Sequence, residues 1–360
     1  MDLKMFLPLS KVYDYLNKIS AIIEIEFYSN SINSFFGYGK FKNRSIFFKL
    51  IDKQNYNKSM SVYIKYGDKL NLCKIVEHMK ISEKYYLVVY EDYKIRYKGI
   101  FNGIEFLNNT SINSTIKVAT FKRFYNNLFY LTKNSLKYEA ITKYPNKVFF
   151  EDRFGTKRLY KYYGLSYATL LYDVKVLLGD DNFILIKKLL SLSKTIICKK
   201  EKTFTNMSHG DLHDLNYCFY PIKNNIYDIL FIDIDTIGIN PFLSDFVCYY
   251  WYLIYQGDHI IYKYNKEFFG KQSHIEKGKR NEQINIYLEH YFYPIINIIG
   301  CKFAWRDEFL RRFIMRILGV YNILYFDIID RKKIYFILIN LLNWYENDKS
   351  SNRLPFNSAI

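Results

Sequence analysis

The alternation of apolar and polar residues near the start of the chain predicts a helix followed by strands. Residues 1–20 carry apolar side chains on one side at helical spacing. Ile23, Ile25 and Phe27 then alternate with glutamates, which is the period of a half-buried strand. Residues 35–41 contain two glycines among aromatic residues, and we expect a hairpin there with the glycines at the bend. The pattern continues with strands at residues 45–51, 73–76 and 85–90 and a helix at residues 56–70.

From residue 99 onward the apolar spacing is mostly helical. Helices are predicted at residues 166–178, 182–198, 246–256, 308–324 and 332–346. We therefore predict an α+β protein with two domains. Residues 1–98 would form a small domain built on an antiparallel sheet, and residues 99–360 a larger, mainly helical one.

Two polar strings stand out against this background. Residues 209–216 read His-Gly-Asp-Leu-His-Asp-Leu-Asn, which puts Asp211 and Asn216 on one short segment. Asp233 follows directly after the apolar run at residues 229–232. These polar residues are the most informative feature of the sequence, because together they supply two carboxylates and an amide.

Short strands flank both strings and indicate how they are brought together. We predict strands at residues 217–220 and 228–232, joined by a turn at residues 221–227 that begins with a proline. A hairpin of this kind brings Asn216 and Asp233 to the same end, as a shared metal ion requires.

The three polar residues have the chemistry that phosphoryl transfer needs. Mg²⁺ prefers oxygen ligands and takes one or two carboxylates plus phosphate oxygens, so Asn216 and Asp233 suit a metal that also binds ATP. Asp211 lies five residues before Asn216, which leaves its carboxylate available to orient and deprotonate a hydroxyl. The strings therefore predict a site that transfers a phosphoryl group to a hydroxyl.

The same strings resemble the aminoglycoside phosphotransferase and choline kinase family. The family pattern His-x-Asp-x-x-x-x-Asn corresponds to residues 209–216, and its Ile-Asp-x-Asp/Glu metal segment corresponds to residues 232–235. Its downstream x-Asp-apolar motif corresponds to residues 244–246. The resemblance, strongest over residues 207–256, implies a two-lobed protein-kinase-like fold with a small antiparallel β-sheet N-lobe and a larger, mainly helical C-lobe.

The resemblance also implies roles for individual residues. Asp211 would be the catalytic residue, and Asn216 and Asp233 would bind Mg²⁺. His209 and Asp245 would brace the catalytic loop instead of touching substrate. The expected reaction moves the γ-phosphoryl group of ATP to a hydroxyl of a small molecule such as a sugar, an amino alcohol or a related metabolite.

In the small lobe, the resemblance points to Lys49 as the residue that binds the ATP phosphates, and to residues 90–92 as the interlobe hinge. The helix after the lysine strand should then carry a glutamate that pairs with Lys49. Ser61 lies near that point, and the helix at residues 56–70 contains no glutamate. The partner of Lys49 is therefore left unassigned.

Two alternative functions remain open. The missing glutamate would suit a catalytically impaired pseudokinase that binds nucleotide without transferring phosphate. A metal-dependent hydrolase could instead use His209, Asp211 and His213, with Asp233 or Asp235 completing the metal site. The hydrolase leaves the rest of both strings unexplained.

Charge narrows the choice of partner. The formal net charge of +17 is spread along the chain and does not form a block, so we expect no nucleic-acid binding. A basic surface favours a neutral or anionic acceptor over a polycationic one. The densest basic cluster, at residues 263–280, is either a solvated loop or a contact for an anionic substrate.

The cysteines and the apolar runs indicate the cellular compartment in which the protein is expected. The 5 cysteines are scattered and form no CxxC motif, which predicts buried, reduced thiols in a cytoplasmic protein. The apolar runs are too short for a signal peptide or a membrane span, so we expect no transmembrane segment.

Overall fold

The computed structural model describes residues 9–30, 35–140, 170–198, 202–223, 225–234, 237–256, 277–300, 304–321 and 328–347. The chain divides into two compact units, each made of two segments. Unit 1 comprises Met1–Thr120 and Asp214–Gly238, and unit 2 comprises Phe121–His213 and Ile239–Ile360.

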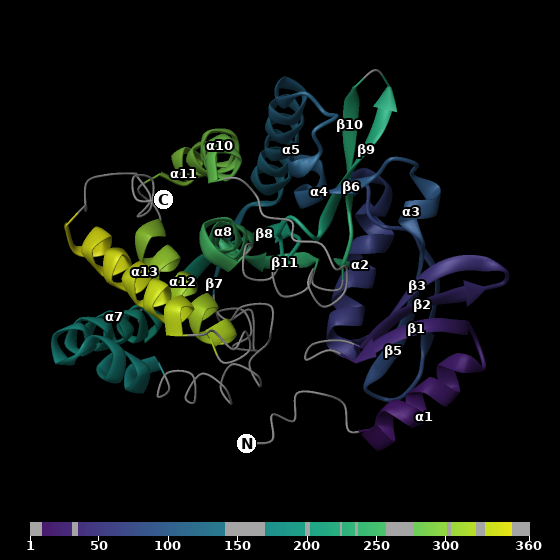
Figure 1. Cartoon of the computed structure of the whole chain (residues 1–360), viewed down its shortest axis with the longest axis horizontal. Helices are drawn as coiled ribbons and strands as arrows, with labels where there is room; N and C mark the ends of the chain where they lie inside the picture. The colour runs from purple at the N-terminus through teal and green to yellow at the C-terminus, as the bar shows by residue number, and fades with distance from the viewer. Residues whose placement is uncertain are drawn as a thin grey trace. The chain divides into compact units, whose positions relative to one another are not determined.

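A five-stranded sheet in the order β1-β2-β3-β5-β4 forms the centre of unit 1 (Figure 1). Every pair of neighbouring strands in it is antiparallel, as predicted from the sequence. Its strands are rich in aromatic and β-branched residues, which pack well on a pleated surface. The strands are β1 (Glu24–Asn30), β2 (Phe35–Phe41), β3 (Arg44–Asp52), β4 (Ile75–Lys80) and β5 (Tyr85–Glu91).

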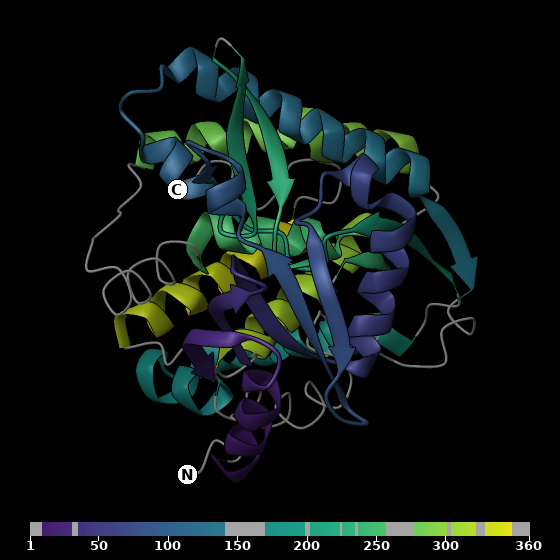
Figure 2. The same ribbon diagram turned by 90° about the vertical axis from the view of Figure 1, so that its right-hand side faces the viewer.

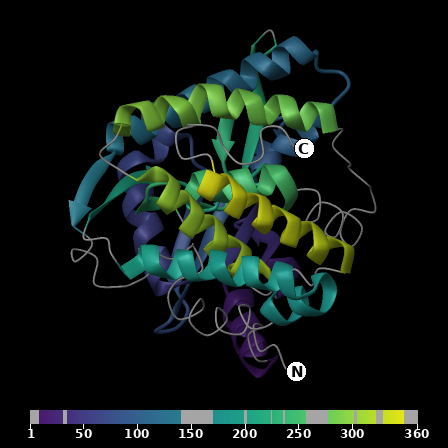
Figure 3. The same cartoon turned by 90° about the vertical axis from the view of Figure 1, so that its left-hand side faces the viewer.

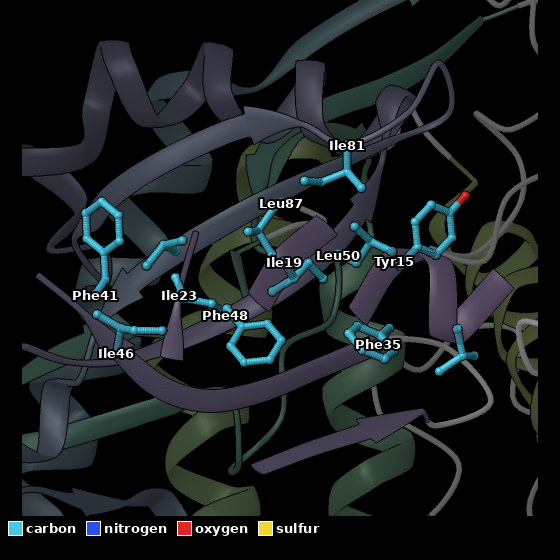
Figure 4. Packing of buried hydrophobic residues seen from close by; sticks show 12 residues of the cluster. Tyr15, Ile19, Ile23, Phe35, Phe41, Ile46, Phe48, Leu50, Ile81 and Leu87 are labelled. Atoms are coloured by element: carbon cyan, nitrogen blue, oxygen red, sulfur yellow. The ribbon is translucent and has the colours of Figure 1, made fainter. Parts of the chain in front are cut away.

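The core of unit 1 lies between this sheet and helix α1 (Leu9–Ser20). Ile46, Phe48 and Leu50 alternate along β3 and are all buried on the face that α1 covers (Figure 4). Ile19 of α1 packs into the same cluster and is fully buried. Burying each large apolar side chain contributes roughly 1.5–3 kcal/mol. The opposite face of β3, which carries Lys49, is therefore left for other partners.

The hairpin predicted at residues 35–41 is wrong, because β2 runs straight through both glycines. The chain turns instead at Lys42 and Asn43, whose φ angles are 49° and 62°. Two consecutive positive φ angles form the type I′ turn that suits a two-residue hairpin. The sequence signal was misleading because this turn uses Lys-Asn where Asn-Gly is more common.

The glycines of β2 are needed for close packing against β1. A Cβ atom on Gly37 would lie 2.1 Å from the carbonyl oxygen of Phe27, and one on Gly39 would lie 2.2 Å from that of Glu24. No side chain fits at such distances unless the backbone moves. Glycine is therefore required here by the approach of the neighbouring strand, not by a bend.

The alternation predicted for β1 holds only at its start. Ile23 is buried, but Phe27 is 46% exposed. The register between β1 and β2 shifts between Ile25 and Phe27, which indicates a β-bulge. Because a bulge inserts one extra residue, it turns the following side chains to the other face.

Helix α2 (Lys53–Leu70) confirms the helix predicted after the lysine strand. It begins earlier than predicted because Asp52 caps it, accepting hydrogen bonds from the backbone N–H groups of Gln54 and Asn55 at 3.0 Å each. It ends at Asn71, which takes the left-handed conformation with φ 50°. The helix lies against β3 and β5 (Figure 2).

A second, three-stranded sheet in the order β10-β9-β6 completes unit 1. It confirms the predicted hairpin, formed by β9 (Tyr217–Lys223) and β10 (Ile226–Phe231), and adds the short β6 (Phe101–Asn102). Helices α3 (Tyr93–Arg96) and α4 (Gly103–Asn108) belong to the same unit. The predicted boundary between residues 98 and 99 thus falls inside unit 1, because β6 pairs with a strand far along the chain.

Unit 2 is mainly helical, with one small sheet in the order β11-β8-β7. Helices α7, α12 and α13 lie side by side in it (Figure 3). The strands of its sheet were not predicted, whereas its helices largely were. Its elements are α5 (Ser114–Ser135), β7 (Lys137–Ala140), α7 (Asp180–Cys198), β8 (Lys202–Ser208), β11 (Gly238–Pro241), α8 (Ser244–Trp251), η4 (Tyr252–Gln256), α10 (Lys277–Tyr287), η6 (Leu288–Phe292), α11 (Tyr293–Ile299), α12 (Trp305–Tyr321) and α13 (Ile328–Asn347).

Several predictions can be compared with only part of the chain. Asp235 lies outside the described residues, as does most of the basic cluster at residues 263–280. Cys73, Cys218 and Cys248 are buried thiols, as predicted. Within the stretches that the structure describes, no helix is long and apolar enough to cross a membrane.

Replacing Gly39 by alanine tests the close packing of β1 on β2. We expect Gly39→Ala to lower the free energy of unfolding by about 1–3 kcal/mol, because the new Cβ collides with a backbone carbonyl. Gly67→Ala is the matched control, since its Cβ would meet nothing closer than 3.5 Å and alanine favours α2 by up to about 1 kcal/mol. Urea midpoints of the two variants should therefore move in opposite directions, and a Gly39→Ala midpoint at or above wild type would contradict this account.

Candidate functional site

Lys49 and Asp233 form an ion pair within unit 1, between Nζ of the lysine and Oδ1 of the aspartate. The lysine side chain is 10% exposed and the aspartate side chain 38%. A buried ammonium group needs an opposite charge, so this contact fixes where the end of the lysine side chain lies. The structure thus brings together the predicted phosphate-binding residue and a predicted metal ligand, which supplies a partner that the sequence left unassigned.

The β9–β10 hairpin positions Asp233 and Asn216. Tyr217 pairs with Phe231 at the end of the ladder, and the backbone N–H of Ile232 donates to the carbonyl oxygen of Asn216 at 3.0 Å. Asp233 follows with φ 55°, the left-handed conformation that aspartate tolerates better than most residues. The two predicted metal ligands therefore lie at the same end of the hairpin.

Asn71, at the end of α2, attaches this hairpin to the rest of unit 1. Its carbonyl oxygen accepts from the backbone N–H of Phe231 at 3.1 Å, and its side-chain amide donates to the hydroxyl of Tyr220 at 2.8 Å and to the carbonyl of Ile229. Sequence reasoning missed Asn71, although an asparagine directly after a helix is a recognisable left-handed cap.

Asp214, within the first string, attaches this part of the chain to its neighbours in unit 1. Its side chain is fully buried and accepts a hydrogen bond from the hydroxyl of Tyr217. Its carbonyl oxygen accepts from the backbone N–H of Gly103 at 2.8 Å. A Cβ on Gly103 would lie 2.8 Å from the Tyr217 hydroxyl, so the glycine permits this approach. Sequence reasoning did not single out Asp214, because it lies within a string already rich in polar residues.

The loop that carries Asp211 belongs to unit 2, where Asp245 holds it. The backbone N–H groups of His209 and Gly210 each donate to the Asp245 carboxylate at 2.6 Å. Asp245 lies in the first turn of α8 and is 5% exposed. It contributes to raising the pKa of the nearby Tyr287 phenol, after burial and Tyr291. The bracing role that the resemblance implied for Asp245 is therefore matched by two short hydrogen bonds in a dry environment.

Asp211 is 2% exposed, and polar side chains of unit 2 lie near its carboxylate. The thiol of Cys248 donates to Oδ1 at 3.3 Å. Nε2 of His213 lies 3.5 Å from Oδ2, and its ring stacks on Tyr252 with 5.1 Å between centroids. Nη2 of Arg316 lies 3.8 Å from Oδ1. The carboxylate therefore lies close to a thiol, an imidazole and a guanidinium group.

Helix α12 carries buried charges that sequence reasoning overlooked. Sequence reasoning singled out no residue of this helix, whereas Arg316 reaches Asp211 from it. Glu308, which is fully buried, forms ion pairs with Arg311 at 2.6 Å and with Arg312 at 2.5 Å. The sequence did contain a signal, because Arg312 and Arg316 lie one helical turn apart among apolar residues of α12. Arginines that are buried in this way are usually paired with an acidic group.

The side chains at the hairpin end fit Mg²⁺ better than a transition metal. Asn216 offers an amide oxygen and Asp233 a carboxylate, which are the hard oxygen ligands that Mg²⁺ prefers alongside phosphate oxygens. Among the residues described, no group of three or more His, Cys, Asp or Glu side chains could hold a metal ion. Asn216 and Asp233 would therefore supply only part of the Mg²⁺ coordination, and phosphate oxygens of a nucleotide would supply further ligands.

Comparison with solved structures identifies the fold. A thermostable variant of aminoglycoside phosphotransferase APH(4)-Ia, solved with ADP and hygromycin B, matches with a TM-score of 0.50 at 9% identity, over 94% of this chain and 99% of that one. The microcompartment-associated aminopropanol kinase matches with a TM-score of 0.48 at 9% identity, over 94% and 96%. Spectinomycin phosphotransferase APH(9)-Ia, in complex with ADP and spectinomycin, gives 0.45 at 14%, over 96% of each chain.

The match to the APH(4)-Ia structure confirms the predicted protein-kinase-like fold, with an antiparallel sheet in the N-terminal part and a mainly helical C-terminal part. The resemblance to aminoglycoside phosphotransferases is thereby confirmed at the level of the fold. Neither a family model nor a curated protein matches the sequence.

Removing the Asp245 carboxylate should loosen the loop before Asp211. We expect Asp245→Ala to leave two buried N–H groups unsatisfied and to destabilise unit 2 by roughly 1–3 kcal/mol for each. Hydrogen exchange followed by mass spectrometry should show faster exchange at His209 and Gly210. Asp228→Ala, on the half-exposed β10, serves as the control, and unchanged protection of the loop in Asp245→Ala would contradict the bracing role.

Proposed function

We propose that this protein is an ATP- and Mg²⁺-dependent phosphotransferase that phosphorylates a hydroxyl group of a small molecule. The observation that carries the proposal is the Lys49–Asp233 ion pair, at the hairpin end that also bears Asn216. A lysine for phosphate oxygens and two oxygen ligands for Mg²⁺ must meet at the same phosphates, and unit 1 holds all three.

The face of the sheet around Lys49 supports a nucleotide as the donor. Phe47 lies two residues before Lys49 on the same face of β3 and contacts Tyr38 and Tyr90, with ring centroids 5.3 Å and 6.0 Å apart. Aromatic rings next to a cationic group suit a purine base joined to phosphates. The APH(4)-Ia structure that shares this fold was solved with ADP, which agrees with this assignment.

In the proposed reaction Asp211 is the catalytic base. Its carboxylate orients the acceptor hydroxyl and takes its proton as the hydroxyl oxygen forms a bond to the γ-phosphorus of ATP. The bond between that phosphorus and the β–γ bridging oxygen breaks, and ADP leaves with the electron pair. His209 and Asp245 act on the loop backbone and keep the carboxylate in position, so they are positioning residues.

Lys49 would bind phosphate oxygens of ATP, and Asn216 and Asp233 would hold the metal ion. When bound, Mg²⁺ supplies positive charge that neutralises the triphosphate. Lys49 and Asp233 pair with each other in the structure. Binding of the nucleotide with Mg²⁺ would separate them, so that Lys49 contacts a phosphate oxygen and Asp233 the metal ion. The acceptor is proposed to be neutral or anionic, in keeping with the net charge of +17.

Three substitutions separate the proposed roles. Asp211→Asn should lower kcat by roughly 10²–10⁴-fold, because the hydroxyl loses its base, and should spare ATP binding. Lys49→Met and Asp233→Asn should weaken binding of Mg²⁺·ATP as well as turnover. The measurements are ADP release over a panel of hydroxylated metabolites and calorimetric titration with a non-hydrolysable ATP analogue.

Asp228→Asn is the matched control, since it removes a carboxylate from the same hairpin while asparagine keeps an oxygen for the Tyr220 hydroxyl, which donates to Asp228 at 3.4 Å. Nucleotide binding without ADP release across the panel would favour the pseudokinase. Stoichiometric zinc that is lost in Asp211→Asn would favour the hydrolase. Equal activity of Asp211→Asn and wild type would refute the proposed mechanism.

A further inference from the structure

Unit 1 contains a pocket of about 310 Å³ with walls from the C-terminal half of α2, the connection to β4, the end of β5, α3 and β10. Lys49, Asn216 and Asp233 are not among the described residues that line it, so it is distinct from the proposed nucleotide site. We propose that this pocket binds a small planar anion, namely a single aromatic or heteroaromatic ring that carries a carboxylate or a phosphate.

The first argument is the size and the lining of the pocket. Pockets that bind small molecules have volumes of roughly 300–1,000 Å³, so this one suits a compact ligand with one ring. Tyr63, Tyr93 and Tyr97 line it together with charged and polar residues. Tyrosine rings offer flat surfaces to a planar group, and the polar residues offer partners to a charged substituent.

The second argument is Gly67, which keeps one wall of the pocket open. Glycine inside a helix is destabilising relative to alanine, and Gly67 lies within α2. Backbone packing does not require it, because a Cβ atom there would meet nothing closer than the ring of Tyr63, at 3.5 Å. Gly67 and Tyr63 are four residues apart and both line the pocket, so a larger side chain would cover the tyrosine ring. The space that the glycine leaves therefore accounts for its presence.

The third argument is that two of the tyrosine rings are held in place by other contacts. The hydroxyl of Tyr63 accepts a hydrogen bond from the backbone N–H of Ile75 at 2.9 Å. The ring of Tyr97 packs on that of Tyr220 with 4.3 Å between centroids, and the amide of Asn71 donates to the Tyr220 hydroxyl at 2.8 Å. A planar ligand would thus meet rings that are already ordered, which lowers the entropic cost of binding.

The fourth argument is the charge of the lining. Among the described residues of the lining, Lys74 and Arg96 are basic and Glu91 is acidic. Arg96 pairs with Glu91 at 2.5 Å and compensates its charge. Lys74 is exposed and forms no ion pair within the part of the chain that the structure describes. An anionic group of the ligand would pair with the Lys74 ammonium group.

The thiol of Cys73, which also lines the pocket, does not oppose an anion. Burial raises the pKa of Cys73 to about 12, so the thiol stays protonated and neutral near pH 7. The backbone N–H of Cys73 donates to the carbonyl oxygen of Phe231 at 2.9 Å, and that of Phe231 donates to the carbonyl oxygen of Asn71 at 3.1 Å. A ligand in the pocket would therefore contact the segment that holds the β9–β10 hairpin.

A cationic ring is the alternative ligand, because three tyrosines suit cation–π contacts. The charges of the lining disfavour it. A cation would approach Lys74, and the Glu91 carboxylate that could attract it is already paired with Arg96.

The experiment compares ligand pairs that keep the ring and differ in charge: benzoate with benzamide, nicotinate with nicotinamide, and phenyl phosphate with phenol. Each is titrated into the full chain by ligand-observed NMR, with Mg²⁺ and a non-hydrolysable ATP analogue present to occupy the proposed nucleotide site. The anionic member should bind more tightly, and the carboxylate and phosphate pairs show which anion is preferred. Benzoate should bind at least about threefold more tightly than cyclohexanecarboxylate, whose ring is not flat.

Lys74→Met tests the charge. It should weaken binding of the anionic member by roughly fivefold and change the neutral member by less than about twofold, because only the anion loses its partner. Lys84→Met is the matched control, since Lys84 is an exposed lysine at the other end of the β4–β5 hairpin. Equal effects of the two substitutions would overturn the inference.

Gly67→Leu tests the space. The new side chain should weaken binding of both members on the order of tenfold or more, because it fills the pocket. Ser61→Leu, on the exposed side of α2, should change neither. The urea midpoint of Gly67→Leu should not fall, since leucine favours a helix over glycine, and this distinguishes a filled pocket from misfolding. Undiminished binding to Gly67→Leu would contradict the proposed site.

Hydrogen exchange locates the bound ligand, and protection should increase at the amides of Cys73 and Phe231. The inference is overturned if no anionic member binds wild type at millimolar concentration, or if benzyltrimethylammonium binds more tightly than benzoate. Failure of the ATP analogue to bind would count against the proposed function alone. Lys74 and Gly67 lie outside the proposed nucleotide site, so the titrations test the pocket in either case.

Discussion

A lysine that is almost buried in a β-sheet needs an opposite charge, and in unit 1 that requirement is met by Asp233. The interaction joins residues 184 positions apart and determines how the β9–β10 hairpin must end. Asn216 lies at the same end because the backbone of Ile232 bonds to it. Asn71, which caps α2, also anchors the β9–β10 hairpin. The end of α2, Lys49 on β3 and the end of the hairpin therefore depend on one another. The left-handed Asp233 is held in place by these surroundings.

In unit 2 the main constraint is to hold the buried carboxylate of Asp211 in a fixed position. Asp211 lies near a thiol, an imidazole and a guanidinium group. Asp245 holds the loop that carries Asp211 by accepting hydrogen bonds from its backbone. Burying so many charges gives little net stability, since the desolvation cost offsets much of the attraction. Their value lies in geometry, because a charge held by several partners does not have to reorganise during a reaction.

Much of this arrangement could be predicted from sequence where the signal was local. The apolar strand at residues 45–51, the hairpin after Asn216 and the aromatic helix after Asp245 could be predicted from local patterns alone. The errors came from interactions between distant segments. The glycines of β2 serve the approach of β1, not a turn, and the two-segment composition of unit 1 depends on β6 pairing with a distant strand. Arg316 was missed because its role appears only when α12 meets the catalytic loop.

The Lys49–Asp233 pair also determines when unit 1 can be completed during synthesis of the chain. On the ribosome β1, β2 and β3 emerge in that order and β5 follows within the same early stretch, so most of the first sheet can form early. The counter-ion of its lysine is made 184 residues later, which at typical synthesis rates is roughly 9–37 s. Throughout this interval the Lys49 face of the sheet lacks its hairpin, so chaperones would meet unit 1 in an incomplete form. Unit 1 is therefore encoded first but completed only after the first segment of unit 2 has been synthesised.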